Sequence, residues 1–213
     1  MTRSDGTPVA APAAERLDGT LVYAVPFSER HMRDPAYLGW LRDYEVIRTL
    51  NLPAYWQPID EAEAHAYCRR LIASARDAFF ALYCRADDAF IGTLRAGHID
   101  RCARVADIGI MIGRRDYWGR GMATDAVAML ARWLVDRLGM RRLTAGAMAI
   151  NPAMIRVFER LGFRREGCLR QQDPLREGGY CDHILLGCLA DELKVPPGAA
   201  KVPESPDEGG AVL

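Results

Sequence analysis

The chain is short of lysine and has no excess of charge of either sign. Only Lys194 and Lys201 are lysines among its 28 basic residues, and 28 acidic residues balance them. A chain with a formal net charge of zero offers no electrostatic reason to bind nucleic acid or an anionic membrane surface. We therefore predict neither partner.

Cysteine motifs are also missing. No two of the six cysteines have C-x-x-C spacing, and no Cys/His cluster has the spacing of zinc ligands, so we predict no metal site. Most of them lie in apolar runs, which is typical of buried, reduced thiols in a cytoplasmic protein. The six are at positions 68, 84, 102, 168, 181 and 188.

Long hydrophobic runs are absent as well. No run approaches the roughly 20 apolar residues of a membrane helix, and the first residues lack the apolar core of a signal peptide. The 213 residues, half of them hydrophobic, suit one domain. Residues 1–18 and 195–213 are rich in Ala, Pro, Gly and charge, so we predict disordered tails around one domain at 19–194.

Hydrophobic periodicity predicts the elements of this domain. Asp60, with Glu63 three residues later, has the pattern of a helix N-cap, and so does Asn151 before Pro152. Gly139 is expected to end the helix before it. The predicted strands are 21–27, 78–85, 90–99, 106–112, 143–148, 163–170 and 180–189. The predicted helices are 28–50, one opened by Asp60, one from 122 to about 138, and 152–161.

The order of these elements indicates a mixed α/β fold. Short links between the three strands in 78–112 favour an antiparallel meander. The whole order is strand, two helices, three strands, helix, strand, helix, two strands. We expect a central, mostly antiparallel sheet of about seven strands flanked by about four helices.

The most informative segment is D-I-G-I-M-I-G-R-R-D-Y-W-G-R-G-M-A-T-D-A, residues 107–126. A strand runs into a glycine-rich turn that opens a helix, and the free N–H groups of a first helical turn bind anions. Gly119 and Gly121 would let the main chain approach a diphosphate closely. By itself, G-x-G before a helix is equally compatible with a plain structural turn.

Two common phosphate-binding motifs do not fit this segment. A P-loop needs Lys and Ser/Thr after its last glycine, and no lysine follows here. A dinucleotide-binding turn needs a third glycine, where this chain has Thr124, and an acidic residue after the next strand. That strand continues into A-M-A-I-N without one.

Two motifs together resemble the GNAT superfamily of acetyltransferases. Trp118-Gly119-Arg120-Gly121-Met122-Ala123 is similar to its [Q/R]-x-x-G-x-[G/A] fingerprint, with Trp118 as a departure. The segment N-P-A-M-I-R-V-F-E-R-L-G-F, residues 151–163, resembles the branch that includes the ribosomal-protein N-terminal acetyltransferases, with Met154 where a serine is usual. The later E-G…G-Y-x-D-H, residues 166–183, looks like the same branch. The resemblance covers residues 78–190 well and 21–77 only by element order.

This resemblance implies a fold and a cosubstrate. In the family, a neighbouring parallel pair of strands splays apart, and the pantetheine arm of acetyl-CoA pairs with the opened edge. For Arg156 and Arg160, which are among the implied residues, a solvated helix face is an equal alternative. The implied acetyl-CoA residues are Ile110, Met111, Ile112, Gly119, Arg120, Gly121, Met122, Ala123, Thr124, Asn151, Arg156, Phe158 and Arg160.

The resemblance also implies N-acetyl transfer to a primary amine through a direct ternary complex. Asp107 aligns with a glutamate that is the general base in some relatives, although a strand-end Asp that satisfies a turn is the alternative. The family's usual general acid is a tyrosine, and this chain has Phe158 and no Tyr in that helix, so the leaving thiolate would take its proton from water. Because Met154 replaces a serine, a non-catalytic acyl-CoA-binding module is the second hypothesis.

The acceptor amine stays open among a protein N-terminus, a small amine and an amino sugar. Trp40, Tyr44, Tyr55 and Trp56 would form an aromatic pocket wall or belong to the core. His183, beside Asp182, is expected to be a structural strand histidine rather than an acid or base. His31, His65 and His98 are expected at the surface or in turns. By resemblance we also expect a homodimer.

Overall fold

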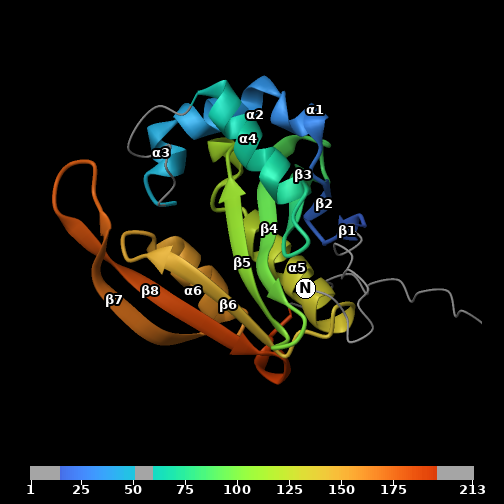
Figure 1. Cartoon of the computed structure of the whole chain (residues 1–213), viewed down its shortest axis with the longest axis vertical. Helices are drawn as coiled ribbons and strands as arrows, with labels where there is room; N and C mark the ends of the chain where they lie inside the picture. Colours follow the sequence, from blue (N-terminus) through green and yellow to red (C-terminus); the bar gives the residue numbers. More distant parts are fainter. Residues whose placement is uncertain (1–14, 51–59, 196–213) are drawn as a thin grey trace, which may run out of the picture.

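The computed structural model describes residues 15–50 and 60–195. Within these residues the chain forms one sheet of eight strands in the order β1-β2-β3-β4-β5-β6-β8-β7. All neighbouring strands are antiparallel except β5 and β6, which run parallel. The expected mixed fold with a mostly antiparallel sheet and one parallel pair is confirmed (Figure 1).

The strands are β1 (Leu17–Asp18), β2 (Val22–Pro26), β3 (Ala78–Cys84), β4 (Phe90–Asp100), β5 (Val105–Ile112), β6 (Arg142–Met148), β7 (Arg164–Pro174) and β8 (Tyr180–Leu189). The helices are α1 (Glu29–Met32), α2 (Pro35–Arg42), α3 (Tyr44–Ile47), α4 (Glu61–Ile72), α5 (Met122–Asp136) and α6 (Pro152–Arg160). Short 3-10 turns occupy Arg115–Tyr117 and Ala190–Glu192.

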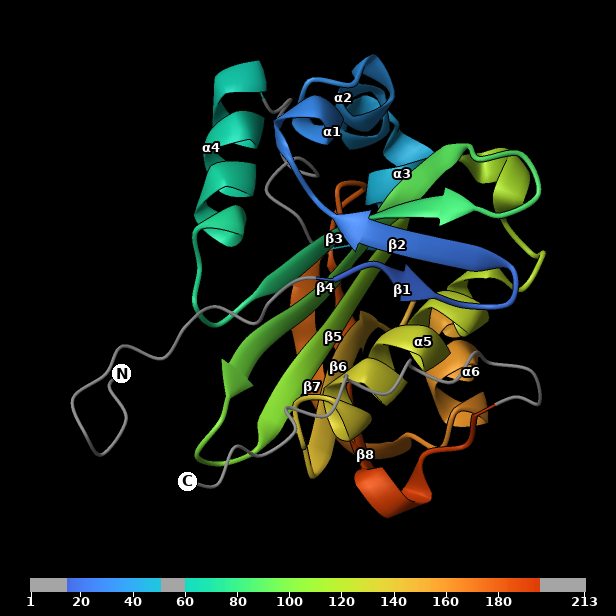
Figure 2. The same ribbon diagram turned by 90° about the vertical axis from the view of Figure 1, so that its right-hand side faces the viewer.

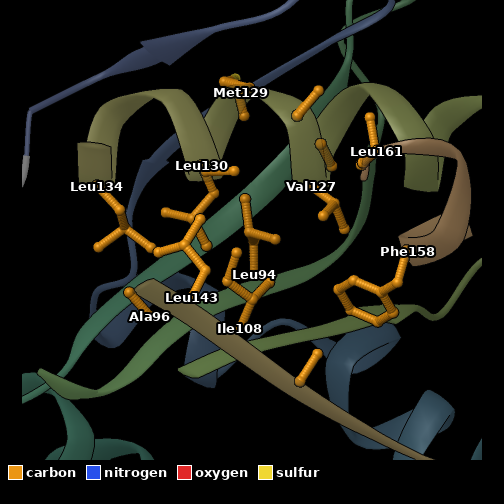
Figure 3. Packing of buried hydrophobic residues seen from close by; sticks show 14 of the residues in the cluster. Leu94, Ala96, Ile108, Val127, Met129, Leu130, Leu134, Leu143, Phe158 and Leu161 are labelled. Carbon is orange, nitrogen blue, oxygen red and sulfur yellow. The ribbon is translucent and has the colours of Figure 1, made fainter. Parts of the chain in front are cut away.

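Helices cover both faces of the sheet. Helices α1 to α4 gather on one side, whereas α5 lies on the opposite side with α6 (Figure 2). The larger core forms where α5 and α6 meet the sheet, with Leu94, Ile108, Leu130 and Phe158 packed together (Figure 3). A smaller aromatic core, which includes Trp40 and Phe79, lies under α1, α2 and α4. The two cores hold the sheet between α1, α2 and α4 on one face and α5 and α6 on the other.

The single helix predicted over 28–50 is wrong, because three short helices replace it. Asp34 and Asp43 both have extended backbone conformations, with ψ of 123° and 110°. Each carboxylate accepts a hydrogen bond from the backbone N–H two residues later, Ala36 and Glu45. Pro35 also disfavours a helical conformation for Asp34. One helix was predicted because the apolar periodicity continues across both breaks. Asp34 and Asp43 are the N-caps at which α2 and α3 begin.

The ordered domain begins earlier than predicted, and one more strand joins the sheet. Leu17 is buried and lies in β1, although residues 1–18 were expected to be disordered. The Asp125 carboxylate on α5 accepts hydrogen bonds from the backbone N–H groups of Thr20, Leu21 and Val22. These bonds fasten the β1–β2 turn to the helix. Residues 1–14 and 196–213 of the predicted tails lie outside the described residues.

The parallel pair is short, and this shapes the site. Register pairs join β5 and β6 only from Val105–Arg142 to Asp107–Thr144. Beyond this point the strands diverge (Figure 1), while β5 stays paired with β4 as far as Ile112. The β5 edge from residue 108 onward is therefore open toward β6, as the resemblance implied.

Candidate functional site

The glycine turn has the backbone that its sequence predicts. Gly119 and Gly121 have φ of 73° and 83°, in the left-handed region where glycine is favoured. Gly121 is the N-cap of α5 and provides no side-chain cap. The first N–H groups of α5 are thus left for an oxygen-rich ligand, and the helix dipole adds positive potential there.

A cavity of about 630 Å³, which we call the turn cavity, connects this turn with the open edge of β5. The exposed indole of Trp118 lines it, and its Nε1 donates to the main-chain oxygen of Ile112 at 2.8 Å. Eleven of the residues implied for acetyl-CoA line the turn cavity: Ile110, Met111, Ile112, Gly119, Gly121, Met122, Ala123, Thr124, Asn151, Arg156 and Arg160.

Asn151 caps α6 as expected and also joins two elements. Its Oδ1 accepts from the backbone N–H of Met154 at 3.2 Å, and its Nδ2 donates to Oγ1 of Thr49 at 3.1 Å. Thr49 follows α3, so this bond ties the start of α6 to the α1–α3 segment. Asn151 therefore holds one wall of the turn cavity in place.

Two of the implied residues lie elsewhere. The Arg120 guanidinium is 5.5 Å from the ring centre of Tyr117 and does not line the turn cavity. Phe158 is buried in the larger core and borders the neighbouring cavity instead. Its ring packs edge-on against Phe163 at 5.0 Å between ring centres, so its surroundings are those of a core residue.

A second cavity of about 730 Å³, which we call the helix cavity, lies on the α2–α4 side of the sheet. Both cavities are lined by Ile110, Met111 and Asn151, so they meet where β5 and β6 separate. The ionisable residues that line the helix cavity come from four different elements: Tyr37, Glu63, Tyr67, Arg70, Arg95 and His183. Of these six residues, only His183 was considered for a role in catalysis from the sequence.

Asp107 lies at the last paired position of β5, next to the helix cavity but not among its lining residues. Its Oδ1 accepts a hydrogen bond from Oγ1 of Thr144 at 2.9 Å. Burial raises the pKa of the Asp107 carboxyl above its usual value, and the Thr144 bond opposes this rise only in part. A carboxylate with a raised pKa is a better base than an exposed one.

The aromatic residues expected near the acceptor divide between core and cavity. Trp40 is buried in the smaller core, 4.8 Å from Phe90 between ring centres. Tyr44 lies outside both cavities, 5.7 Å from the Arg176 guanidinium. Tyr55 and Trp56 lie outside the described residues. Tyr37 and Tyr67 line the helix cavity instead, because they face the sheet from α2 and α4.

The histidines differ from expectation in two places. His31 is buried rather than exposed, and burial lowers its pKa to about 4. His183 pairs with Asp173 and not with its sequence neighbour Asp182, with 2.6 Å between Nδ1 and Oδ2. Asp182 cannot be the partner, because successive residues of a strand point to opposite faces of the sheet. The Asp182 carboxylate instead accepts a hydrogen bond from the backbone N–H of Gln171. Asp173 was missed because its partner lies across a hairpin.

The described residues contain no group of three or more His, Cys, Asp or Glu side chains that could hold a metal ion. They also contain no helix long and apolar enough to cross a membrane. The site consists of two cavities that meet, one at the glycine turn and the N-terminus of α5, and one that includes ionisable residues from four elements.

Sequence comparison places residues 25–164 in a known domain family, the acetyltransferase (GNAT) domain. The "Probable N-acetyltransferase YjcK" of Bacillus subtilis (strain 168) is 32% identical over 111 residues, which are 52% of this chain. That match spans 60% of the relative's length, less than two thirds of it.

Two solved structures share the fold. RimL, a ribosomal L7/L12 alpha-N-protein acetyltransferase in complex with coenzyme A, has a TM-score of 0.73 at 20% identity, over 84% of this chain and 99% of its own. Spermidine N-acetyltransferase from Vibrio cholerae, in complex with CoA and spermine, has a TM-score of 0.71 at 16% identity, over 81% and 97%. With the family match covering residues 25–164, the chain belongs to the GNAT acetyltransferase family.

Proposed function

We propose that this protein transfers an acetyl group from acetyl-CoA to a primary amine while both substrates are bound. The observation that carries this proposal is the early end of the β5–β6 pairing at Asp107 and Thr144. The strand edge that opens there lies where the two cavities meet. One cavity would hold the thioester and the other the amine.

In this proposal the turn cavity binds acetyl-CoA. The amide groups of the pantetheine arm would pair with the open main-chain edge at Ile110–Ile112, as an added strand would. The diphosphate would accept hydrogen bonds from the first N–H groups of α5, beyond Gly121. Arg156 and Arg160 line the same cavity one helical turn apart and would add positive charge near the phosphates.

The helix cavity would hold the acceptor. Amine transfer needs a neutral nucleophile, a hydrogen-bond donor for the oxyanion that forms, and a proton for the leaving thiolate. The main-chain N–H groups of the open β5 edge are the donors we propose for the oxyanion. Phe158 occupies the position of the family's usual acid, so the thiolate would be protonated by water. Holding both substrates in line supplies much of the rate.

We keep Asp107 as a proposed contributor to amine deprotonation. Its raised pKa and its place beside the opening support this role. Because Asp107 lies next to the helix cavity without lining it, we propose that it acts through a water or through its charge. The Thr144 hydrogen bond would hold its carboxylate in position.

For the acceptor we propose a protein N-terminal amine or a small amine. Two relatives of the same fold act on such groups according to their names, one on a ribosomal protein and one on spermidine. The helix cavity has room for either kind of amine end, and it carries both acidic and basic groups, such as Glu63 and Arg70. We also propose a homodimer, which light scattering at micromolar concentration would test.

A thiol-release assay tests the proposal. Acetyl-CoA would be incubated with the protein and a panel of amino-terminal peptides, polyamines and amino sugars. We expect release of free thiol that depends on one class of amine. If acetyl-CoA raises the melting temperature but no amine yields thiol, the chain is a non-catalytic acyl-CoA-binding module instead.

A further inference from the structure

We propose that His183 and Asp173 form a catalytic dyad in which Nε2 of His183 removes the proton from the incoming amine. This inference rests on the proposed acetyl transfer. The geometry points to it because a buried carboxylate orients an imidazole that lines the acceptor side of the site.

The local backbone brings Asp173 inward from an exposed strand. Asp173 is the only buried residue of β7, and its side chain is completely enclosed. The β7–β8 register shifts between Leu169 and Asp173, and Gln171 in this interval has φ of 52°. A non-glycine residue rarely adopts this conformation, and it persists only where the surroundings enforce it. The irregularity turns the carboxylate toward the body of the protein.

The hydrogen bond fixes which imidazole nitrogen is available. The Asp173 carboxylate accepts, so Nδ1 of His183 donates the proton at 2.6 Å. Nε2 then carries the lone pair and is able to accept a proton. Among the residues that the structure describes, none hydrogen-bonds Nε2. The arrangement matches the orienting role of a carboxylate in other acid–base dyads, where it selects the tautomer and stabilises the charged imidazole.

The imidazole lies beside the strand opening. His183 pairs in register with Met148 on β6, the strand that diverges from β5. Its Nε2 lies over Gly146, where any Cβ would collide with it. Across the opening, Gly109 on β5 faces open space on the same cavity. Because Gly109 and Gly146 have no side chains, the part of the helix cavity beside Nε2 is not filled from these two positions.

Charged groups from several elements line the same cavity as His183. Arg95 on β4 is already paired with Asp77 at 2.5 Å, and Asp107 lies near enough to His183 for an electrostatic interaction. Asp173 on β7 and Asp107 on β5 interact with the imidazole. The other ionisable groups that line the helix cavity are Tyr37 on α2, Glu63, Tyr67 and Arg70 on α4, and Arg95 on β4.

The proposed reaction starts from an acceptor amine in its protonated form. The ammonium gives one proton to Nε2 of His183, and the neutral nitrogen attacks the thioester carbonyl carbon. The N–C bond forms and the C–S bond breaks, while the second proton lost by the nitrogen reaches the thiolate through water. The imidazolium then returns its proton to solvent. Each turnover yields amide, free thiol and one solvent proton.

The test compares His183→Gln with wild type in the thiol-release assay across pH. At pH 7 we expect kcat to fall about a hundredfold, within the range for losing a general base. The deficit should narrow as pH approaches the usual amine pKa of about 10, because the acceptor then arrives neutral. Acetyl-CoA should still raise the melting temperature as in wild type. His98→Gln is the matched control, since His98 is exposed and lines neither cavity.

Two further variants separate positioning from folding. Asp173→Asn should lower kcat with little change in KM, because an amide that donates to Nδ1 leaves the proton on Nε2. Gly146→Ala keeps both dyad residues but displaces the imidazole, so it should also lower kcat. Gly146→Ala therefore still tests the dyad if the Asp173→Asn protein does not fold.

The outcomes distinguish this inference from the proposed function. If wild type releases no thiol with any amine, the transferase function and the dyad both fail. If wild type is active and folded His183→Gln keeps its rate and pH profile, the dyad alone is overturned.

Discussion

The turn cavity and the helix cavity lie side by side but are built by different means. The turn cavity contains a local main-chain feature, two left-handed glycines and a helix N-terminus close together in sequence. The helix cavity is shaped by side chains from α2, α4 and at least four strands. A ligand common to a whole family can be bound by main chain, whereas an acceptor that varies must be recognised by side chains. Substitutions in the two cavities should therefore have different effects.

The largest effect is expected from Gly121→Glu in the turn cavity. Acetyl-CoA at a hundred times its Kd should stabilise wild type by about 2.7 kcal/mol. A side chain and a negative charge at the proposed diphosphate site should reduce this gain to near zero. Thermal unfolding with and without acetyl-CoA measures it.

Gly139→Glu is the matched control for that substitution. Gly139 also has a positive φ, of 65°, and a Cβ there meets open space at the far end of α5. The backbone strain is comparable, but the ligand gain should persist. A folded Gly121→Glu protein that keeps the full gain would place the cofactor elsewhere.

A smaller effect is expected from Asp107→Asn, next to the helix cavity. Loss of the carboxylate should lower kcat about tenfold or more at neutral pH and leave acetyl-CoA affinity nearly intact. The pH–rate profiles of both proteins measure it. A variant with wild-type kcat from about pH 6 to 9 would make Asp107 a structural residue.

The same substitution should stabilise the fold at neutral pH. The pKa of Asp107 is raised in the folded protein, so its protonated form is favoured there and its ionisation opposes folding. Stability from this group is fully present below the unfolded pKa and is lost as pH rises from there through the raised folded pKa. Asn removes the buried charge, so its melting temperature should exceed that of wild type at pH 7 and not at pH 3. An equal or lower value at pH 7 would contradict this reasoning.

The smallest effect is expected from Arg156→Gln and Arg160→Gln. Partly exposed ion pairs contribute about 0.2–1 kcal/mol each, so the KM for acetyl-CoA should rise at most about fivefold per variant. Steady-state kinetics in low salt measures the change. Arg164→Gln, which loses an exposed pair with Glu192 outside the cavities, should leave KM unchanged. No change in either test variant would mean that both arginines belong to a solvated helix face.

The same contrast explains what the sequence could predict. Gly119, Gly121 and Asn151 belong to local motifs whose backbone conformations follow from residue type, and the structure gives all three the expected geometry. The pairing of Asp173 with His183 depends on a register shift within β7, which no periodicity reveals. The helix breaks at Asp34 and Asp43 lie at residues that favour helix N-caps, and Asp34 also precedes a proline. The apolar periodicity, which continues across both residues, predicted one helix instead.

The central claim is that both cavities are filled at once and that the amine attacks the thioester directly. Initial velocities measured while both substrates are varied test this claim most directly, once the amine panel has supplied an acceptor. We predict double-reciprocal lines that intersect and a protein that carries no acetyl group after incubation with acetyl-CoA alone. Parallel lines, together with an acetylated protein in the absence of amine, would contradict the account.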